Sequence, residues 1–241
     1  MPWSQLKQRL LPHGVMTARH HLAEFARDAS ESLLPGAIIL DAGAGDSPYR
    51  EYFGDVIYEA ADWCTRPSHD YRQVTYVCDL TAIPVESNRY DCVLCTQVLE
   101  HVPEPAKVLR ELNRVLKPGG KLWISAPLSF EEHETPHDYF RYTQYAWKYM
   151  MDEAGFDIER LEWVQGYLGT LAYQLNLARR NLPKRAVDYG GGSFGYLAAG
   201  IVRIAKPVLM GLAWLFARAD VRRKYTAGGH CLDYQLVASK R

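Results

Sequence analysis

The sequence predicts an α/β protein whose seven-stranded sheet is mostly parallel, with an antiparallel last strand and helices on both faces. Two observations lead to this prediction. Short apolar segments alternate with segments of helical periodicity, as where residues 91–95 precede apolar positions three and four apart over 105–116, and such alternation is typical of parallel sheets. The first apolar segment, 38–40, runs into a turn that contains Gly43 and Gly45. The expected strands lie at about 38–40, 56–61, 75–78, 91–95, 121–126, 158–163 and 231–238.

Length and composition favour one domain over residues 1–241. Within it we expect an N-terminal helical cover at 1–35 and a helical insertion at 165–228. The formal net charge is zero, which gives no electrostatic reason to expect a nucleic-acid partner. Met1–Leu11 has no long apolar core, so no secretory signal is expected. The five cysteines fit a reduced, cytoplasmic protein.

The glycine turn after the first strand has the features of a nucleotide-type binding corner. Gly43 and Gly45 let the backbone turn sharply, and Ser47 and Pro48 are typical of an N-cap and a first helical residue. We therefore expect a helix to begin there. Pro48 occupies the position where a dinucleotide fingerprint has its third glycine, which argues against a nicotinamide cofactor.

Acids also follow the next two expected strands. Asp62 lies about 20 residues beyond Asp41, where βαβ sites place a carboxylate that accepts hydrogen bonds from ribose hydroxyls. Trp63 could then lie against an adenine ring. At the end of the third strand, Asp79 could accept from the adenine amino group while Leu80 packs on the ring. The alternative for both acids is that they cap turns.

Three motifs resemble those of the class I S-adenosylmethionine-dependent methyltransferases. The order acid-x-Gly-x-Gly at Asp41–Gly45 resembles their first motif, although Ser47 stands where many members have another glycine. YDCVLCTQVLEHVPEP and LRELNRVLKPGGKLWISAP resemble the fourth and fifth motifs of a branch that includes the ubiquinone and menaquinone methyltransferases. The resemblance covers roughly residues 36–160. It implies a Rossmann-like fold and S-adenosyl-L-methionine as cofactor.

The same resemblance implies roles for individual residues. The glycine turn underlies the methionine part of the cofactor, and the acid before it orders the turn and the cofactor's amino group. Gln97 and Val98 lie along the cofactor, and Glu100-His101 opens the helix that follows, with His101 more a structural cap than a catalytic group. The cofactor-binding residues expected are thus Asp41, Ala42, Gly43, Gly45, Tyr49, Asp62, Trp63, Asp79, Leu80, Gln97 and Val98.

The segment after the fifth strand, 127–142, is the densest group of polar and aromatic residues in the chain. It follows a strand end, where doubly wound sheets bind substrates. His137 and His133 are candidate general bases, Asp138 could orient an imidazole, and Arg141 could hold a carboxylate or phosphate. Alternatively, the histidines bond within the loop. The pattern resembles methyltransferases found with polysaccharide and other glycan biosynthesis, and no metal site is expected.

These observations predict O-methylation of a small-molecule, glycan or lipid-linked saccharide acceptor by in-line displacement. Two alternatives stay open: a non-catalytic protein that keeps the S-adenosylmethionine fold for binding, and a nucleotide-cofactor oxidoreductase. Nucleic-acid methylation is not expected, because basic residues are not concentrated and the motifs of base methyltransferases are absent from the sequence.

Residues 194–217 in the insertion are strongly apolar and are followed by Arg218, Arg222, Arg223 and Lys224. Their number is near that of a membrane span. Arg203 and Lys206 would each cost about 2.5–3.5 kcal/mol at a bilayer centre, and Pro207 should interrupt the helix. A peripheral membrane contact through 194–224 therefore fits better than a span. A lid over the active site and a homodimer contact are the other interpretations.

Overall fold

The computed structural model describes residues 14–65 and 70–241. The expectations for Met1–Leu11 and for the turn at 66–69 therefore fall outside the described residues. The chain forms two compact units, which we describe separately. The sheet unit comprises the described residues of Leu22–Val164 and Leu232–Arg241, and the insertion unit comprises residues 14–21 together with Gln165–Cys231.

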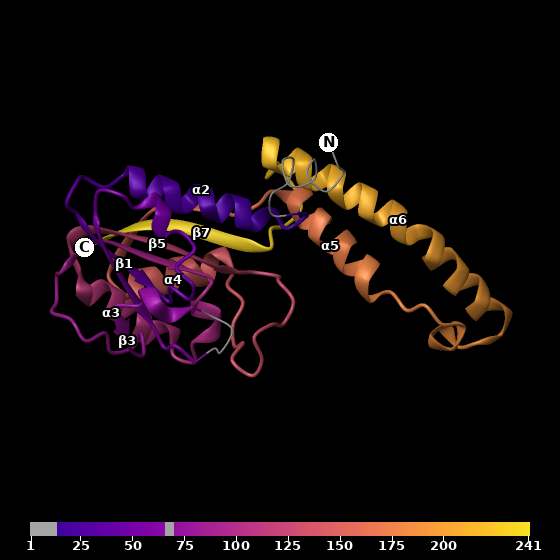
Figure 1. Ribbon diagram of the computed structural model, residues 1–241, viewed down its shortest axis with the longest axis horizontal. Helices are drawn as coiled ribbons and strands as arrows, with labels where there is room; N and C mark the ends of the chain where they lie inside the picture. Colours follow the sequence, from indigo (N-terminus) through magenta and orange to yellow (C-terminus); the bar gives the residue numbers. More distant parts are fainter. Residues whose placement is uncertain (1–13, 66–69) are drawn as a thin grey trace. The chain divides into compact units, whose positions relative to one another are not determined.

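A single sheet of seven strands forms the centre of the sheet unit in the described part of the chain, in the order β3-β2-β1-β4-β5-β7-β6. Figure 1 labels β1, β3, β5 and β7 of this sheet. Neighbouring strands among β1 to β5 are parallel to each other. Strand β7 is antiparallel to both of its neighbours, β5 and β6. The fold class predicted from the sequence is confirmed. The strands are β1 (Ile38–Ala42), β2 (Ile57–Asp62), β3 (Tyr76–Val77), β4 (Tyr90–Thr96), β5 (Leu116–Pro127), β6 (Phe156–Trp163) and β7 (Asp233–Lys240).

The strand order reverses between β1 and β4, which pair with Asp41 opposite Leu94. Chain connections leave β1 toward one edge of the sheet and β4 toward the other. Ligands of open α/β sheets bind at such a switch point, outside the carboxyl ends of the strands. The glycine turn after β1 and the segment after β4 therefore meet where a binding site is expected.

Helices cover both faces of this sheet. On α2 (Thr17–Glu31), Phe25, Ala26 and Ala29 pack against Ile39 and Leu94 in one buried cluster. The helices α3 (Pro105–Val115) and α4 (Gln144–Glu153) lie on the opposite face (Figure 1). The apolar face of α3 is buried because its apolar residues recur three and four apart.

Two helix starts expected from the sequence are wrong. Ser47 has φ +50°, outside the extended region that an N-cap needs. Only a short 3₁₀ turn, η1 (Arg50–Tyr52), follows. After β4, a 3₁₀ turn η3 (Leu99–His101) contains the Glu-His pair, and α3 begins only at Pro105, where proline suits a first helical position.

The insertion unit is helical. It contains α5 (Tyr167–Asn181), the 3₁₀ turn η4 (Ala186–Tyr189) and α6 (Gly192–Arg222). The expectation that Pro207 interrupts the helix is wrong, because α6 continues through it. Proline removes one N–H donor, and packing of α6 along α5 supports the turns on either side. By length and composition, α6 could cross a membrane.

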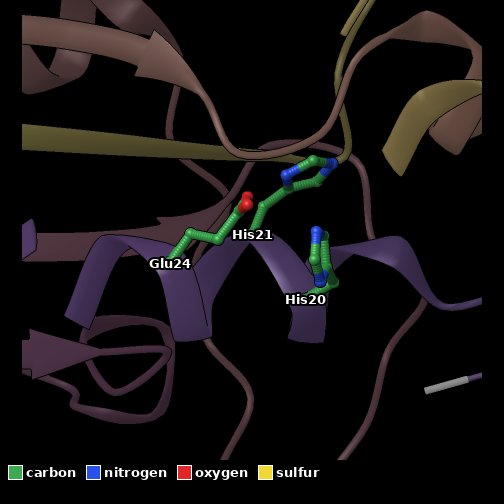
Figure 2. A group of neighbouring side chains, drawn as sticks. All are labelled: His20, His21 and Glu24. Atoms are coloured by element: carbon green, nitrogen blue, oxygen red, sulfur yellow. The ribbon is translucent and has the colours of Figure 1, made fainter. Parts of the chain in front are cut away.

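A buried carboxylate ties the ends of this unit together. Asp220, near the end of α6, accepts hydrogen bonds from Thr17 Oγ1 (2.9 Å) and the backbone N–H of Gly166 (2.9 Å), and lies 3.1 Å from His21 Nε2. Figure 2 shows His21 with its neighbour His20 and with Glu24, three residues further along α2. Asp220 is fully buried, so these partners replace the water that the carboxylate loses.

Candidate active site

The glycine turn lies at the carboxyl ends of β1 and β2. The backbone N–H groups of Gly43 and Ala44 both donate to the carbonyl of Ala61 (2.8 and 3.2 Å). Gly43 has φ +78°, and a Cβ there would lie 2.4 Å from Cγ2 of Val98. A side chain is therefore excluded for two reasons, left-handed backbone and contact with the segment after β4. Val98, expected along the cofactor, packs against this turn.

Asp62, at the end of β2, fastens the turn. Its Oδ2 accepts from the N–H of Gly45 (2.9 Å), and its Oδ1 accepts from the N–H of Cys64 (2.7 Å). A carboxylate has about four acceptor positions, so these two bonds leave capacity for two adjacent hydroxyls. The expected ribose role and the observed turn-fastening role are compatible.

Asp41 points into the core, where its carboxyl group is buried and accepts a short hydrogen bond from the hydroxyl of Tyr58. Burial raises the pKa of Asp41 to about 7; the Tyr58 bond opposes this shift and the charge of Asp62 adds to it. Ala42 is buried, and Tyr49 packs against the core cluster beside α2. The partner of the Asp41 carboxyl group is thus Tyr58 on β2.

The two residues expected around an adenine ring after β3 differ in their surroundings. Asp79 Oδ1 accepts from both the N–H and the hydroxyl of Thr81 (2.8 Å each), which is the turn cap named as the alternative. Leu80 is buried. Trp63, after β2, is 59% exposed, and its ring lies edge-on to that of His137, with centroids 6.5 Å apart. An expected cofactor residue and an expected catalytic residue therefore adjoin.

Gln97 follows β4 directly and has φ +56°, which is uncommon for a residue with a side chain. Its N–H donates to the Ser125 carbonyl (2.9 Å), and its side-chain amide donates to the Ser125 hydroxyl (3.2 Å). Backbone strain of this kind is concentrated at functional sites. Gln97 is held at the switch point by β5, consistent with a position along the cofactor.

Hydrogen bonds to the segment after β4 hold the loop 127–142 in place. The N–H of Tyr139 donates to the carbonyl of Glu100, and the Tyr142 hydroxyl donates to the carbonyl of Leu99 (2.8 Å each). The loop therefore stands beside η3, although 36 residues separate His101 from His137 in the chain.

Arg141 is used inside the loop. Its guanidinium makes two bonds to Asp138 (2.6 and 2.7 Å) and donates to the carbonyls of Phe130, Glu131 and Phe140 (2.8–2.9 Å). These bonds occupy all five of its N–H donors, and they hold the pKa of Asp138 well below its usual range. A grip of Arg141 on a substrate carboxylate or phosphate would require breaking them, so the structure makes it a brace of the loop.

The two expected histidines have separate partners. His133 donates its backbone N–H to Asp138 Oδ2 (2.8 Å), and its ring Nδ1 lies 3.1 Å from the Glu131 carbonyl and 3.5 Å from the same Asp138 oxygen. The Glu131 carbonyl therefore orients the His133 ring, and Asp138 fixes its backbone. His137 is exposed, and its Nδ1 lies 3.1 Å from the Tyr139 hydroxyl.

A third imidazole, which the sequence favoured only as a cap, completes the group. His101 Nδ1 lies 2.6 Å from the His137 carbonyl and must donate to it, which leaves Nε2 as the proton acceptor. Burial lowers the pKa of His101, although the His137 carbonyl and the charge of Glu134 oppose the shift. Glu134 Oε2 lies 3.3 Å from Nε2, so its carboxylate can pair with the imidazolium that forms when Nε2 is protonated.

Glu100, which the sequence analysis did not select, lies beneath this group. It is fully buried, neither carboxyl oxygen has a hydrogen-bond partner among residues 14–65 and 70–241, and burial raises its pKa to about 8. Carboxyl and ring atoms of Glu100, His101 and His133 come within 4.8 Å of one another. An adjacent acid and histidine directly after a central strand were the available signal for both residues.

Comparison with known proteins agrees with this geometry. Residues 40–124 match the family model described as a methyltransferase domain. The ubiquinone biosynthesis O-methyltransferase of Marinobacter nauticus is 46% identical over 56 residues, which are 23% of this chain and 23% of that protein. The corresponding enzyme of Xanthomonas oryzae is 48% identical over 56 residues, 23% of this chain and 22% of that protein. The match thus spans under a quarter of these relatives' length.

Solved structures share the fold over nearly the whole chain. A putative sarcosine dimethylglycine methyltransferase from Galdieria sulphuraria aligns with a TM-score of 0.55 at 19% identity, covering 93% of this chain and 84% of that one. Phosphoethanolamine N-methyltransferase 2 of Haemonchus contortus, in complex with S-adenosyl-L-methionine, gives 0.56 at 18%, covering 92% and 52%. The cyclase SpnF gives 0.54 at 20%, covering 91% and 79%.

Proposed function

We propose that this chain, a class I S-adenosylmethionine-dependent methyltransferase, transfers a methyl group to a hydroxyl oxygen of a small-molecule acceptor. The observation that carries the proposal is one juxtaposition. A strand-end turn fastened by Asp62 adjoins, through Trp63 and His137, a loop that places the ring of His133 against that of His101. The names of the curated relatives, which are O-methyltransferases, support transfer to oxygen.

The residues after β1 and β2 fit the cofactor by their chemistry. Gly43 and Gly45 are partly exposed in a turn against which Val98 packs, and Asp62 keeps acceptor capacity for the two ribose hydroxyls. When bound, S-adenosylmethionine supplies an electrophilic methyl group on a sulfonium. Holding an acceptor in line with that methyl group could contribute about 7–11 kcal/mol to lowering the barrier.

His101 is the base that the geometry supports best. Its fixed Nδ1–H leaves Nε2 to accept the hydroxyl proton, and Glu134 then stabilises the imidazolium. A base of this kind contributes roughly 10²- to 10⁴-fold. His137 stays a candidate because it is exposed beside Trp63, and His133, with Asp138, stays one because it lies against His101. Arg141 supports all three by fixing the loop.

The test is methyl transfer from labelled S-adenosylmethionine to a panel of phenols, glycans and lipid-linked saccharides. We expect His101→Ala to lower kcat at least about 100-fold on an acceptor that the wild type uses, while S-adenosylhomocysteine affinity stays within a few fold. His137→Ala and His133→Ala should each lower kcat less. His230→Ala, an exposed histidine of the insertion unit, is the control and should leave kcat unchanged.

The alternatives predict other results. A shared fold does not decide the reaction, since the structural neighbour SpnF is a cyclase. Tight S-adenosylhomocysteine binding without transfer to any acceptor would favour a non-catalytic binding protein. Binding of a nicotinamide cofactor in place of S-adenosylhomocysteine would favour an oxidoreductase, against which Pro48 already argues. Transfer to amines alone would contradict the oxygen acceptor.

A further inference from the structure

Charge is divided unevenly along this neutral chain. Residues 165–231 contain ten Lys and Arg but only two Asp, Asp188 and Asp220, which gives a formal charge of +8 within a chain whose net charge is zero. Both acids are already engaged: Asp220 is buried among Thr17, His21 and Gly166, and Asp188 pairs with Arg185 at 2.9 Å. The insertion unit therefore presents mainly positive charge.

Helix α6 also carries an apolar stripe on its surface. Seven large apolar side chains, each between 38% and 75% exposed, recur three or four residues apart. At about 100° per residue they fall within a sector of about 80°, and at about 1.5 Å rise per residue the stripe is about 32 Å long. We define the α6 stripe as Phe194, Leu197, Ile201, Ile204, Val208, Leu212 and Leu215.

The other side of α6 is already used within its own unit. Gly195, Ala199, Ala213 and Ala217 are buried there, and α6 packs along α5 and η4. A Cβ on Gly195 would lie 2.4 Å from the carbonyl oxygen of Ala186, so η4 touches the helix backbone. Packing thus fixes which face points outward, and the α6 stripe is that face.

We propose that the α6 stripe docks on the surface of an anionic lipid bilayer, with the helix lying in the interface. An apolar face buried at the level of the acyl chains, with basic residues at the headgroups, is the physical basis of interfacial helices. Arg222, Arg223 and Lys224 are exposed directly beyond the stripe, and Lys184 and Arg185 are exposed in the segment that leads to α6. Anionic headgroups attract such clusters.

Two other occupants fit the observations less well. A membrane span would bury Arg203 and Lys206 mid-helix, where Lys206 Nζ donates to the Leu182 carbonyl (3.1 Å), and would strip α5 and η4 from the opposite side. A second copy of this chain would bring two strongly basic units face to face, and like charges repel. An anionic bilayer satisfies both the apolar stripe and the positive charge.

The test is flotation of the purified full-length protein with vesicles of phosphatidylcholine alone or of phosphatidylcholine with about one third phosphatidylglycerol. We expect binding to the anionic vesicles, at least about tenfold weaker binding to neutral ones, and loss on raising NaCl from about 0.1 to about 0.5 M. Ile201→Glu/Ile204→Glu should lower binding at least about tenfold. Both side chains are exposed, so the fold should tolerate the change.

The matched control is Leu34→Glu/Ile57→Glu, which adds the same charge at two exposed apolar positions of the sheet unit and should bind as the wild type does. Circular dichroism and S-adenosylhomocysteine affinity verify folding of both variants and do not depend on the acceptor. Equal binding by wild type and the α6 variant would overturn the proposal. So would retention after alkaline carbonate extraction, which indicates a span, or a dimer without vesicle binding that the α6 variant dissociates.

Discussion

At the scale of single residues, one carboxylate joins two strand ends. Asp62 is the last residue of β2. Its carboxylate accepts hydrogen bonds from the N–H of Gly45, in the turn after β1, and from the N–H of Cys64, two residues further along its own segment. Its carboxylate can accept further hydrogen bonds, which is why we expect it also to bind ribose hydroxyls. The same side chain therefore shapes the corner and is expected to bind the ligand in it.

Asp62→Ala should weaken S-adenosylhomocysteine binding about 10- to 100-fold, because hydrogen bonds to a charged group contribute about 1.5–3 kcal/mol. Isothermal titration calorimetry measures this. Asp79→Ala, whose carboxylate caps the turn at Thr81, should have a smaller effect. Asp55→Ala, an exposed acid after η1, should have none. Unchanged affinity in Asp62→Ala rejects the ribose role.

Glu100 makes the stability of the protein depend on pH. Burial raises its pKa from 4.5 to about 8, so the folded protein keeps a proton that the unfolded chain releases above pH 4.5. The stabilising contribution is complete below that pH and disappears as pH rises through about 8. Asp41, with its pKa raised to about 7, acts in the same direction at lower pH.

We therefore expect the free energy of unfolding to fall between pH 7 and 8.5, and the fall to be smaller by about 1 kcal/mol in Glu100→Gln, which keeps a neutral side chain. Urea denaturation at the two pH values measures it. Glu104→Gln, at a position exposed beside Lys107, serves as the control. A wild-type slope retained in full by Glu100→Gln would show that another group titrates.

At the scale of elements, buried polar contacts hold each irregular segment to its scaffold. Arg141 uses five donors to fix loop 127–142, so the imidazoles are presented by an ordered segment. In the insertion unit, Asp220 fixes the end of α6 to the start of α5 and to Thr17. A Cβ on Gly169 would lie 2.4 Å from both Asp220 and Thr17, so this junction is closely packed.

Asp220→Ala should lower the free energy of unfolding by about 3 kcal/mol, because it leaves the buried donors of Thr17 and Gly166 without a partner. Thermal and urea denaturation measure the loss. Asp188→Ala removes an aspartate of the same unit from a surface ion pair with Arg185, and should change stability by at most about 1 kcal/mol. Similar effects of the two substitutions would mean that the Asp220 contacts contribute little.

At the scale of the whole molecule, positive and negative charges are concentrated in different parts of the chain, although the net charge is zero. The +8 of residues 165–231 is balanced by the remainder of the chain, which carries −8, since the total is zero. Binding of such a molecule to a charged surface depends on which unit faces that surface. The net charge of the whole chain predicts this binding poorly.

This division has a chromatographic consequence. At pH 7 and low salt the protein should be retained on a cation exchanger despite its zero formal charge. Arg222→Glu/Arg223→Glu/Lys224→Glu, which reverses three exposed charges, should elute at lower salt. Lys107→Glu/Arg110→Glu on α3 is the control on the sheet unit and should shift elution less. Passage of the wild type through the column without retention would contradict the prediction.

The sequence alone determined the sheet and the corner after β1. Alternation and glycine turns are local properties of neighbouring residues, so the seven strands, the order acid-x-Gly-x-Gly and the position of Asp62 could all be predicted. The helical content of the insertion followed from the same periodicity. Local signals failed at Ser47 and Pro207, where the left-handed backbone of one residue and the packing of a neighbouring helix decided the outcome.

Only the tertiary structure decided the partners of the side chains. From the sequence, the five N–H donors of Arg141 were expected to be available to a substrate. In the folded protein they are hydrogen-bonded to Asp138 and to three backbone carbonyls. His101 gained a fixed tautomer because a carbonyl 36 positions away lies against its ring. Hydrogen bonds form between groups that are near in space, and residue type and spacing do not specify which distant groups the fold brings within reach.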